Sequence, residues 1–227
     1  MATLLIDADD TLWENNIYFE EVIATMLARL ERRGFARAEI RARLNAIERR
    51  RAATSGYGIR NFSFSLADTC RELITDAGVE EEVREVARLC KTLAARPVAV
   101  LPGVGETLEA LARRHQLVLF TKGDEDDQRS KVDRSGLARY FASTHIVREK
   151  DPASYADVID RCAIEPAEAW MVGNSPRSDI LPALEAGLGA VFIPHHATWE
   201  LEHGEIPSGD GHRLLVLREF RELLDHF

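Results

Sequence analysis

The feature that most constrains the fold of this chain is an alternation of short apolar runs with stretches of helical spacing. The runs have the length and composition of buried β-strands, and they cover residues 3–7, 116–121, 144–148, 169–173 and 190–194. Between the later runs, segments such as 103–115 and 178–188 carry apolar residues at helical intervals. Strands that alternate with helices of about 10 to 15 residues are typical of a parallel sheet with crossover helices. The sequence therefore predicts an α/β core.

Residues 14–96 interrupt this alternation directly after the first strand. Helical spacing there covers residues 17–33, 37–51, 63–77 and 80–95, and no convincing strand pattern occurs. Gly34 and Gly78 separate some of these stretches, as expected for breaks between helices. We therefore expect a helical domain of residues 14–96, inserted into an α/β core domain of residues 1–13 and 97–227.

Composition narrows the classes of function. The chain has 227 residues, 45% of them apolar, enough for a substantial core, and its formal net charge of −9 argues against binding to nucleic acid or to an anionic membrane. No run approaches the roughly 18 uncharged apolar residues of a membrane span, and the first residues lack the pattern of a signal peptide, so we expect a cytoplasmic protein. Cys70, Cys90 and Cys162 fit neither a CxxC metal spacing nor a disulfide framework, and we interpret them as reduced thiols.

Polar residues gather at the carboxyl ends of four of the predicted strands. In chain order these residues are Asp7 and Asp9, then Thr121 with Lys122 and Gly123, then Lys150, and finally Asn174 and Asp179. Ligands of open α/β sheets bind at this edge, so we expect carboxylates, a hydroxyl and an ammonium group to converge there. The acidic cluster at the first strand is interpreted as a site that holds positive charge, with a solvated acidic turn as the alternative.

These segments resemble the four sequence motifs of the haloacid dehalogenase superfamily, in the same order. The motifs read DADDT from Asp7, FTKG from Phe120, Lys150 alone, and GNSPRSD from Gly173 to Asp179. The resemblance covers nearly the whole chain, because the helical insertion stands where that family places its first-type cap. It implies a Rossmann-like core with an inserted α-helical cap, and a hydrolase of the phosphatase type that uses Mg²⁺.

The residue types suit phosphoryl transfer, in which cations must offset the charge of a phosphate monoester near an anionic nucleophile. Asp7 is the candidate nucleophile, forming an aspartyl-phosphate, and Asp9 is the candidate acid and base. Thr121 and Lys150 would hold the phosphoryl group. Mg²⁺ takes oxygen ligands, which Asp7, the backbone carbonyl of Asp9 and Asp179 would supply.

An aspartate at position 9 also favours one reaction over others. By resemblance, it marks phosphatases and phosphomutases, whereas the dehalogenases and the ATP-driven pumps of the superfamily carry other residues there. The sequence therefore predicts a phosphatase that acts on a small phosphorylated metabolite. The alternatives are a phosphomutase and a non-catalytic binding or regulatory protein on the same fold, and nothing in the sequence indicates the oligomeric state.

Two positions depart from the pattern of the family. Asn174 stands where an aspartate is frequent, so metal binding could be weaker, or Asn174 could act only behind the ligands. Lys122 stands where asparagine is common, and it either adds a cation beside Gly123 in the phosphate site or points to solvent. Lys122 and Lys131 are also alternatives to Lys150 as the cation beside the nucleophile.

The remaining conspicuous residues are not assigned to the chemical step. Asp10 is expected to shape the turn after the first strand. Neighbouring residues seldom face the same way on regular structure, so His195 and His196 are interpreted as loop histidines near the cleft. In the helical domain, residues 55–64 mix glycines, aromatics and polar residues. Tyr57, Arg60 and Asn61 of that segment are candidates for contacting the substrate, with an ordinary interhelix loop as the alternative.

Overall fold

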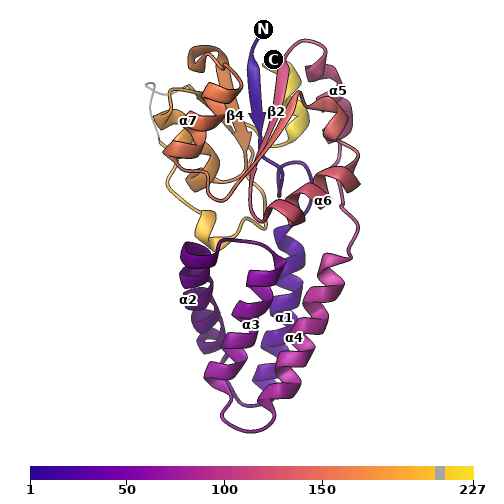
Figure 1. Cartoon of the computed structure of the whole chain (residues 1–227), viewed down its shortest axis with the longest axis vertical. Helices are drawn as coiled ribbons and strands as arrows, with labels where there is room; N and C mark the ends of the chain where they lie inside the picture. The colour runs from indigo at the N-terminus through magenta and orange to yellow at the C-terminus, as the bar shows by residue number, and fades with distance from the viewer. Residues whose placement is uncertain (208–212) are drawn as a thin grey trace. The chain divides into compact units, whose positions relative to one another are not determined.

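The computed structural model describes residues 1–207 and 213–227. The chain folds into two compact units (Figure 1). One consists of Met1–Asn16 and Val98–Phe227, and the other of Ile17–Pro97. Among the described helices, none combines the length and the apolar composition that crossing a membrane requires.

The first unit is built on a parallel sheet whose strand order is β3-β2-β1-β4-β5-β6. The strands are β1 (Thr3–Ile6), β2 (Gln116–Lys122), β3 (Ser143–Val147), β4 (Ala169–Gly173), β5 (Gly189–Phe192) and β6 (Leu214–Val216). The predicted α/β core is therefore confirmed. Strand β6 was not predicted: its residues are apolar, but the strand has only three of them and lies at the sheet edge, where Val216 is 61% exposed.

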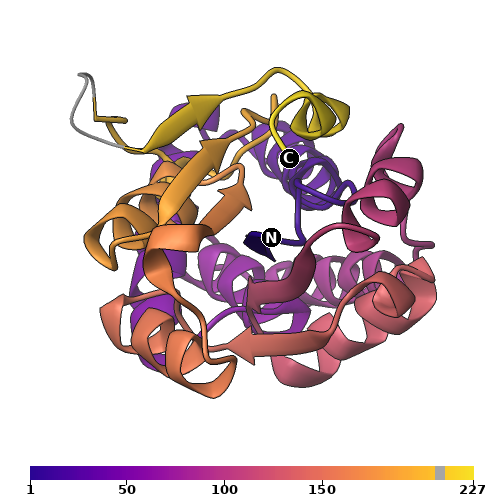
Figure 2. The ribbon, with the colours of Figure 1, turned by 90° about the horizontal axis from the view of Figure 1, so that it is seen from above.

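Helices cover both faces of this sheet (Figure 2). They are α5 (Val104–Ala112), α6 (Glu125–Ser135), α7 (Pro152–Arg161) and α8 (Leu181–Glu185), joined by 3₁₀ turns at Ala138–Tyr140, Pro166–Glu168, Glu200–Glu202 and Phe220–Asp225. Helix α6 begins after Asp124, whose side chain accepts hydrogen bonds from two backbone N–H groups of the first turn. Helix α7 begins with a capping box between Asp151 and Ser154. These caps satisfy backbone donors that a helix start leaves unpaired.

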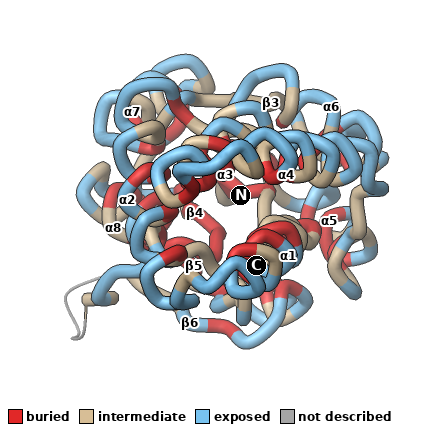
Figure 3. Tube along the Cα trace, turned by 90° about the horizontal axis from the view of Figure 1, so that it is seen from below, coloured by how far each residue is buried: buried red, intermediate tan, exposed pale blue. Residues whose placement is uncertain are grey.

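The strands bury both faces, as expected when helices cover both sides of a parallel sheet. Along β1, Leu4 and Ile6 point to one face and Leu5 to the other, because side chains alternate along a strand. The first face packs against apolar residues of α5 and the C-terminal segment, including Leu108 and Leu223. In Figure 3, buried and exposed positions alternate along the helices that enclose the sheet.

The second unit is helical. Its elements are α1 (Asn16–Arg32, which starts one residue before the unit), α2 (Arg37–Ser55), α3 (Ile59–Leu73) and α4 (Val79–Ala94). Their apolar stripes form one core, which includes Met26, Leu30, Leu44 and Leu66. All four predicted helices are present, although α3 begins four residues before its predicted start. Phe62 packs its ring against Phe19, with ring centroids 4.8 Å apart, and this contact favours a helix that begins directly after Gly58.

Candidate active site

Asp7 lies at the centre of the carboxyl edge of the sheet. It follows β1, which is flanked by β2 and β4, and its backbone N–H donates to the carbonyl of Val172 in β4 at 2.9 Å. Its side chain is enclosed by neighbouring residues, and Asp7 is only 7% exposed to solvent. The sheet thus fixes this carboxylate at the position where open α/β folds bind their ligands.

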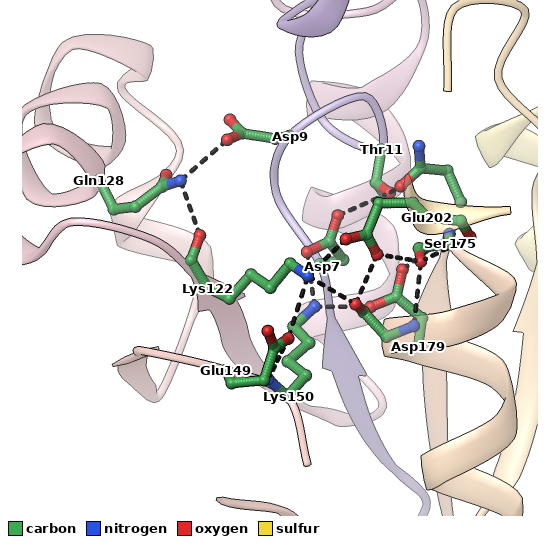
Figure 4. Close-up of polar contacts among 12 residues, drawn as sticks. Asp7, Asp9, Thr11, Lys122, Gln128, Glu149, Lys150, Ser175, Asp179 and Glu202 are labelled. Carbon is green, nitrogen blue, oxygen red and sulfur yellow. Dashed lines mark hydrogen bonds and ion pairs between the residues drawn. The ribbon is translucent and has the colours of Figure 1, made fainter. Parts of the chain in front are cut away.

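A buried lysine joins Asp7 to Asp179. Lys150 Nζ lies 2.6 Å from Asp7 Oδ1 and 2.6 Å from Asp179 Oδ1 (Figure 4), and its side chain is 1% exposed. Thr11 donates its hydroxyl to Asp7 Oδ2 at 3.1 Å. Of the three lysines considered from the sequence, the structure places Lys150 beside the candidate nucleophile.

The charges of this cluster do not balance. Burial raises the pKa of Asp7 to about 7; Lys150 opposes this increase and the negative charge of Asp179 adds to it. Burial also acts to lower the pKa of Lys150, but the carboxylates of Asp179 and Asp7 outweigh it and raise that pKa. Two carboxylates therefore share a single ammonium group in a site shielded from water, which leaves negative charge for a further cation to offset.

The segment after β4 positions Asp179 by close packing. The backbone N–H of Ser175 donates to Asp179 Oδ2 at 3.0 Å. Gly173 is required here, because a Cβ at that position would lie 2.1 Å from the same oxygen. Asp179 belongs to a π-helical turn, Pro176–Ile180, a geometry that is frequent at functional sites. Tyr155 donates its hydroxyl to the carbonyls of residues 178 and 179, and so holds the turn against α7.

The donor atoms around Asp7 fit Mg²⁺. They are the carboxylates of Asp7 and Asp179 and the amide of Asn174, whose Oδ1 lies 3.4 Å from the hydroxyl of Thr11. Asn174 is 6% exposed and Asp179 is 1% exposed. A set made of oxygens with excess negative charge is the kind that Mg²⁺ prefers in proteins.

Asp9 faces away from Asp7, toward Gln128 (Figure 4). Its carboxylate accepts hydrogen bonds from Trp13 Nε1 at 2.8 Å and from Gln128 Nε2 at 2.8 Å, and both of its oxygens lie 2.6 Å from Lys131 Nζ. The structure therefore keeps the two predicted catalytic aspartates apart. Gln128 and Lys131 lie on α6, and no sequence pattern indicates the contact of Gln128 or Trp13 with Asp9.

The other candidate phosphate ligands have different surroundings. Thr121, near the end of β2, is 1% exposed. Lys122 does not point to solvent, since its Nζ lies 2.5 Å from Glu202 Oε1 and 3.0 Å from Glu149 Oε1. The backbone N–H of Gly123 donates to the carbonyl of Val147 at 2.9 Å, which ties β2 to β3.

Glu202 is a buried carboxylate of the site that sequence reasoning missed. It lies in the turn Glu200–Glu202 and is 9% exposed. Its Oε2 accepts hydrogen bonds from the hydroxyls of Ser175 and Ser178, both at 2.5 Å. Burial acts to raise the pKa of Glu202, but Lys122 and the two hydroxyls outweigh it and lower that pKa. No motif surrounds this residue, so only the folded chain reveals it.

Asp10 shapes the turn after β1, as expected, and it also begins a helix. Its backbone adopts φ +62°, a left-handed conformation that aspartate tolerates better than most residues. Its Oδ1 accepts hydrogen bonds from the backbone N–H groups of Asn15, at 2.8 Å, and Asn16, at 3.0 Å. Burial, and next the charge of Asp9, raise the pKa of Asp10 from 3.8 to about 7.

Asp10→Asn is expected to stabilise the metal-free protein above pH 7. Because the folded-state pKa of Asp10 is raised from 3.8 to about 7, its contribution to stability is full below pH 4 and is lost as the pH rises to 7. The amide avoids this loss, so the free energy of unfolding should increase at pH 8 by up to roughly 4 kcal/mol. Urea unfolding at pH 8 and pH 5 measures the difference, which should shrink at pH 5. An equal change at both pH values would contradict the assignment.

The three candidate substrate contacts lie in the second unit, around the start of α3. Asn61 Nδ2 donates to the carbonyls of residues 55–57, at 2.8, 3.1 and 3.4 Å, so its side chain closes the turn between α2 and α3. Arg60 stacks over the ring of Phe64, with its guanidinium carbon 5.7 Å from the ring centroid. Tyr57 lies in the turn itself. Arg60 and Asn61 belong to the helix rather than to a loop.

The parallel sheet thus brings two aspartates and a lysine together, buried at its carboxyl edge. The sequence model of the haloacid dehalogenase-like hydrolases matches residues 1–187. A crystal structure of a haloacid dehalogenase-like family hydrolase from Xanthomonas campestris superimposes with a TM-score of 0.82, at 30% identity, over 96% of this chain and 87% of that one. The chain belongs to the haloacid dehalogenase-like hydrolase family, as the four motifs indicated.

Two curated relatives are phosphatases. Phosphoserine phosphatase of Thermus thermophilus is 27% identical over 85% of this chain and 88% of its own length. Phosphoglycolate phosphatase 1 of Pseudomonas aeruginosa is 33% identical, but over 55% of this chain and 46% of its own length. The first match therefore spans most of both proteins, whereas the second covers only part of each.

Proposed function

We propose that this protein is a Mg²⁺-dependent phosphatase that hydrolyses a small phosphorylated metabolite through an aspartyl-phosphate, and that it acts in the cytoplasm. The observation that carries the proposal is the buried cluster of Asp7, Lys150 and Asp179, with two carboxylates on one ammonium group. The presence of Asp9, two residues after Asp7, favours a phosphatase over a dehalogenase. The phosphatases among the relatives support small phosphate monoesters as the substrate class.

Each residue of the cluster has a part in the proposed reaction. Asp7 attacks the phosphorus atom, for which it must be ionised, and Lys150 offsets the charge that collects around the attacking carboxylate. Thr121 donates its hydroxyl to a phosphoryl oxygen. Mg²⁺, held by Asp7, Asp179 and the Asp9 carbonyl with Asn174 beside them, would supply the positive charge that the buried carboxylates lack. Because the pKa of Asp7 is about 7 without metal, that charge also favours its reactive form.

Asp9 changes partners in this scheme. In the structure its carboxylate is held by Lys131 and Gln128. As a carboxylate it is suited to accept the proton of the water that hydrolyses the aspartyl-phosphate. To donate a proton to the leaving oxygen, it must first leave Lys131 and turn toward Asp7. We also propose that the helical unit serves as a cap that selects the leaving group, with Tyr57, Arg60 and Asn61 as its candidate contacts.

The direct test is hydrolysis of p-nitrophenyl phosphate by the purified protein. We expect phosphate release with Mg²⁺ and none with excess EDTA, and we expect a higher melting temperature with Mg²⁺ than without it. Asp157→Asn, an exposed aspartate of α7, is the matched control and should retain full activity. If the protein hydrolysed none of a panel of phosphorylated metabolites, and its melting temperature did not change with Mg²⁺, it would instead be a binding protein on this fold.

Asp9→Asn should affect substrates according to their leaving groups. Aliphatic alcohols leave poorly without a proton, so kcat for an alkyl phosphate should fall by about 10² to 10⁴-fold. Nitrophenolate is a better leaving group, and formation of the aspartyl-phosphate from p-nitrophenyl phosphate should be much less affected. Burst kinetics separate this step from the later hydrolysis. Equal losses in the first step for both substrates would rule out Asp9 as the acid.

A further inference from the structure

A second group of possible metal ligands lies outside the oxygen cluster around Asp7. Glu14, His195 and His196 each present one ligand atom, and the three atoms lie within 4.8 Å of one another. Glu14 belongs to the segment between the Asp10 turn and α1, and the histidines belong to the loop after β5. The sequence interpretation, two loop histidines near the cleft, did not include this grouping with Glu14. Because the loop lacks the regular alternation of a strand, the two rings come within 4.4 Å of each other, measured between centroids.

Two atoms of this group are buried and unsatisfied. His195 Nε2 lies 3.1 Å from Glu14 Oε2, yet among the described residues neither atom makes a hydrogen bond of acceptable geometry. The side chain of His195 is 7% exposed. Buried polar atoms without partners are uncommon in folded proteins, because each one loses its hydrogen bonds to water. An ion placed between the imidazole and the carboxylate would satisfy both atoms.

The opposite side of the His195 ring is already supported. Nδ1 accepts a hydrogen bond from the backbone N–H of Ala197 at 3.3 Å and lies 3.6 Å from Asp10 Oδ1. Binding of a metal at Nε2 would move the ring proton to Nδ1, which would then exchange its contact with Ala197 for one with Asp10. A carboxylate behind a ligating histidine is the usual means of orienting such a ring. Nε2 faces Glu14, so it is the ring nitrogen that a metal shared with Glu14 would take.

We propose that Glu14, His195 and His196 bind a divalent transition metal ion of the Zn²⁺ type, at a site separate from the Mg²⁺ site. Two imidazoles with one carboxylate suit Zn²⁺ and related ions, whereas Mg²⁺ prefers oxygen donors alone. Ligands of one tetrahedral zinc ion lie about 3.4 Å apart, so the present spacing needs only a small side-chain adjustment. His196 is exposed and can make that adjustment, and it gives the ion a route from solvent. The bound ion would fasten the loop after β5 to the segment that leads into α1.

Metal titration in the presence of excess Mg²⁺ tests this site without reference to catalysis. With Mg²⁺ filling the oxygen site, the wild-type protein should bind one Zn²⁺ by calorimetry and should gain melting temperature on binding. Co²⁺ in place of Zn²⁺ should show the visible absorption of a site with nitrogen ligands. Glu14→Gln and His196→Ala should each weaken the affinity by at least about tenfold. Both changes leave the core intact, because His196 is exposed and glutamine has the shape of glutamate.

His203→Ala is the matched control, since His203 is also an exposed histidine of the segment after β5 but lies outside the cluster. Its affinity for Zn²⁺ should equal that of the wild type. Unchanged binding by His196→Ala and Glu14→Gln would overturn the proposal, as would an equal loss in His203→Ala. Because the readouts are metal binding and absorption, the result does not depend on phosphatase activity. The zinc site can be absent from an active phosphatase, and it can be present in a protein that hydrolyses no phosphate.

Discussion

Asp7→Asn should abolish phosphatase activity while leaving the fold intact. The amide cannot attack phosphorus to form the aspartyl-phosphate, and loss of the nucleophile in a covalent mechanism costs at least roughly 10⁴-fold in kcat. Asparagine has the size of aspartate, and its amide oxygen can still accept from Lys150 while its NH2 group donates to the hydroxyl of Thr11. Steady-state hydrolysis of p-nitrophenyl phosphate with Mg²⁺ measures the loss, and the exposed Asp157→Asn variant again controls for a general effect of removing a carboxylate.

Stability separates this chemical loss from simple unfolding. Burial raises the pKa of Asp7 to about 7, so above that pH the charged form destabilises the metal-free folded state. The neutral amide should therefore melt at least as high as the wild type at pH 8 without metal. A phosphorylated form should be trapped in the wild type by rapid acid quenching, should be cleaved by hydroxylamine, and should be missing in Asp7→Asn. Activity that survives this substitution would exclude Asp7 as the nucleophile.

The sequence was sufficient to predict the sheet because its central strands are nearly continuous apolar runs. Leu4, Leu5 and Ile6 of β1 are fully buried, which is the pattern that a parallel sheet covered on both faces imposes. The edge strand β6 is apolar too, but with three residues it is shorter than the runs from which the other strands were predicted. The start of α3 was missed for a related reason. The composition of residues 55–64 is typical of a loop, and the packing of Phe62 against Phe19 is a contact between segments far apart in the chain.

The candidate site also contains some residues that could be placed from sequence and others that could not. Residues that directly follow a strand could be placed from sequence, because the carboxyl ends of parallel strands share one edge; Asp7 and Lys150 follow that rule. The order of the motifs favoured Lys150, but Lys122 and Lys131 remained alternatives, because all three lysines follow strands or lie on the next helix. Which ammonium group lies beside Asp7 is seen only in the folded chain. The orientation of Asp9 and the presence of Glu202 depend likewise on contacts between distant segments, for which no local pattern exists.

Lys150→Met should cause the largest loss of stability of any single substitution in the site. The lysine is buried between two carboxylates, at 2.6 Å from each, and methionine has a similar volume without the charge. Removing one partner of a buried ion pair leaves an uncompensated charge, at a cost of about 3–5 kcal/mol. The pKa of Asp7, already about 7, should rise further in the variant, because the nearest positive charge is gone.

The pH dependence of this loss identifies its cause. Asp7 of the variant has a higher pKa in the folded state than in the unfolded state, so its penalty grows as the pH rises from about 4 and is greatest above the folded-state value. Urea unfolding should therefore show a larger loss of stability at pH 8 than at pH 5, and Mg²⁺ should recover part of it by replacing the missing positive charge.

Lys131→Met is the control, since Lys131 pairs with Asp9 at a position where both side chains reach solvent, 19% and 23% exposed. Its smaller loss should change little between the two pH values. If Lys150→Met lost no more free energy of unfolding than Lys131→Met at pH 8, or if Mg²⁺ did not reduce its loss, then Lys150 would not offset the charge of this site.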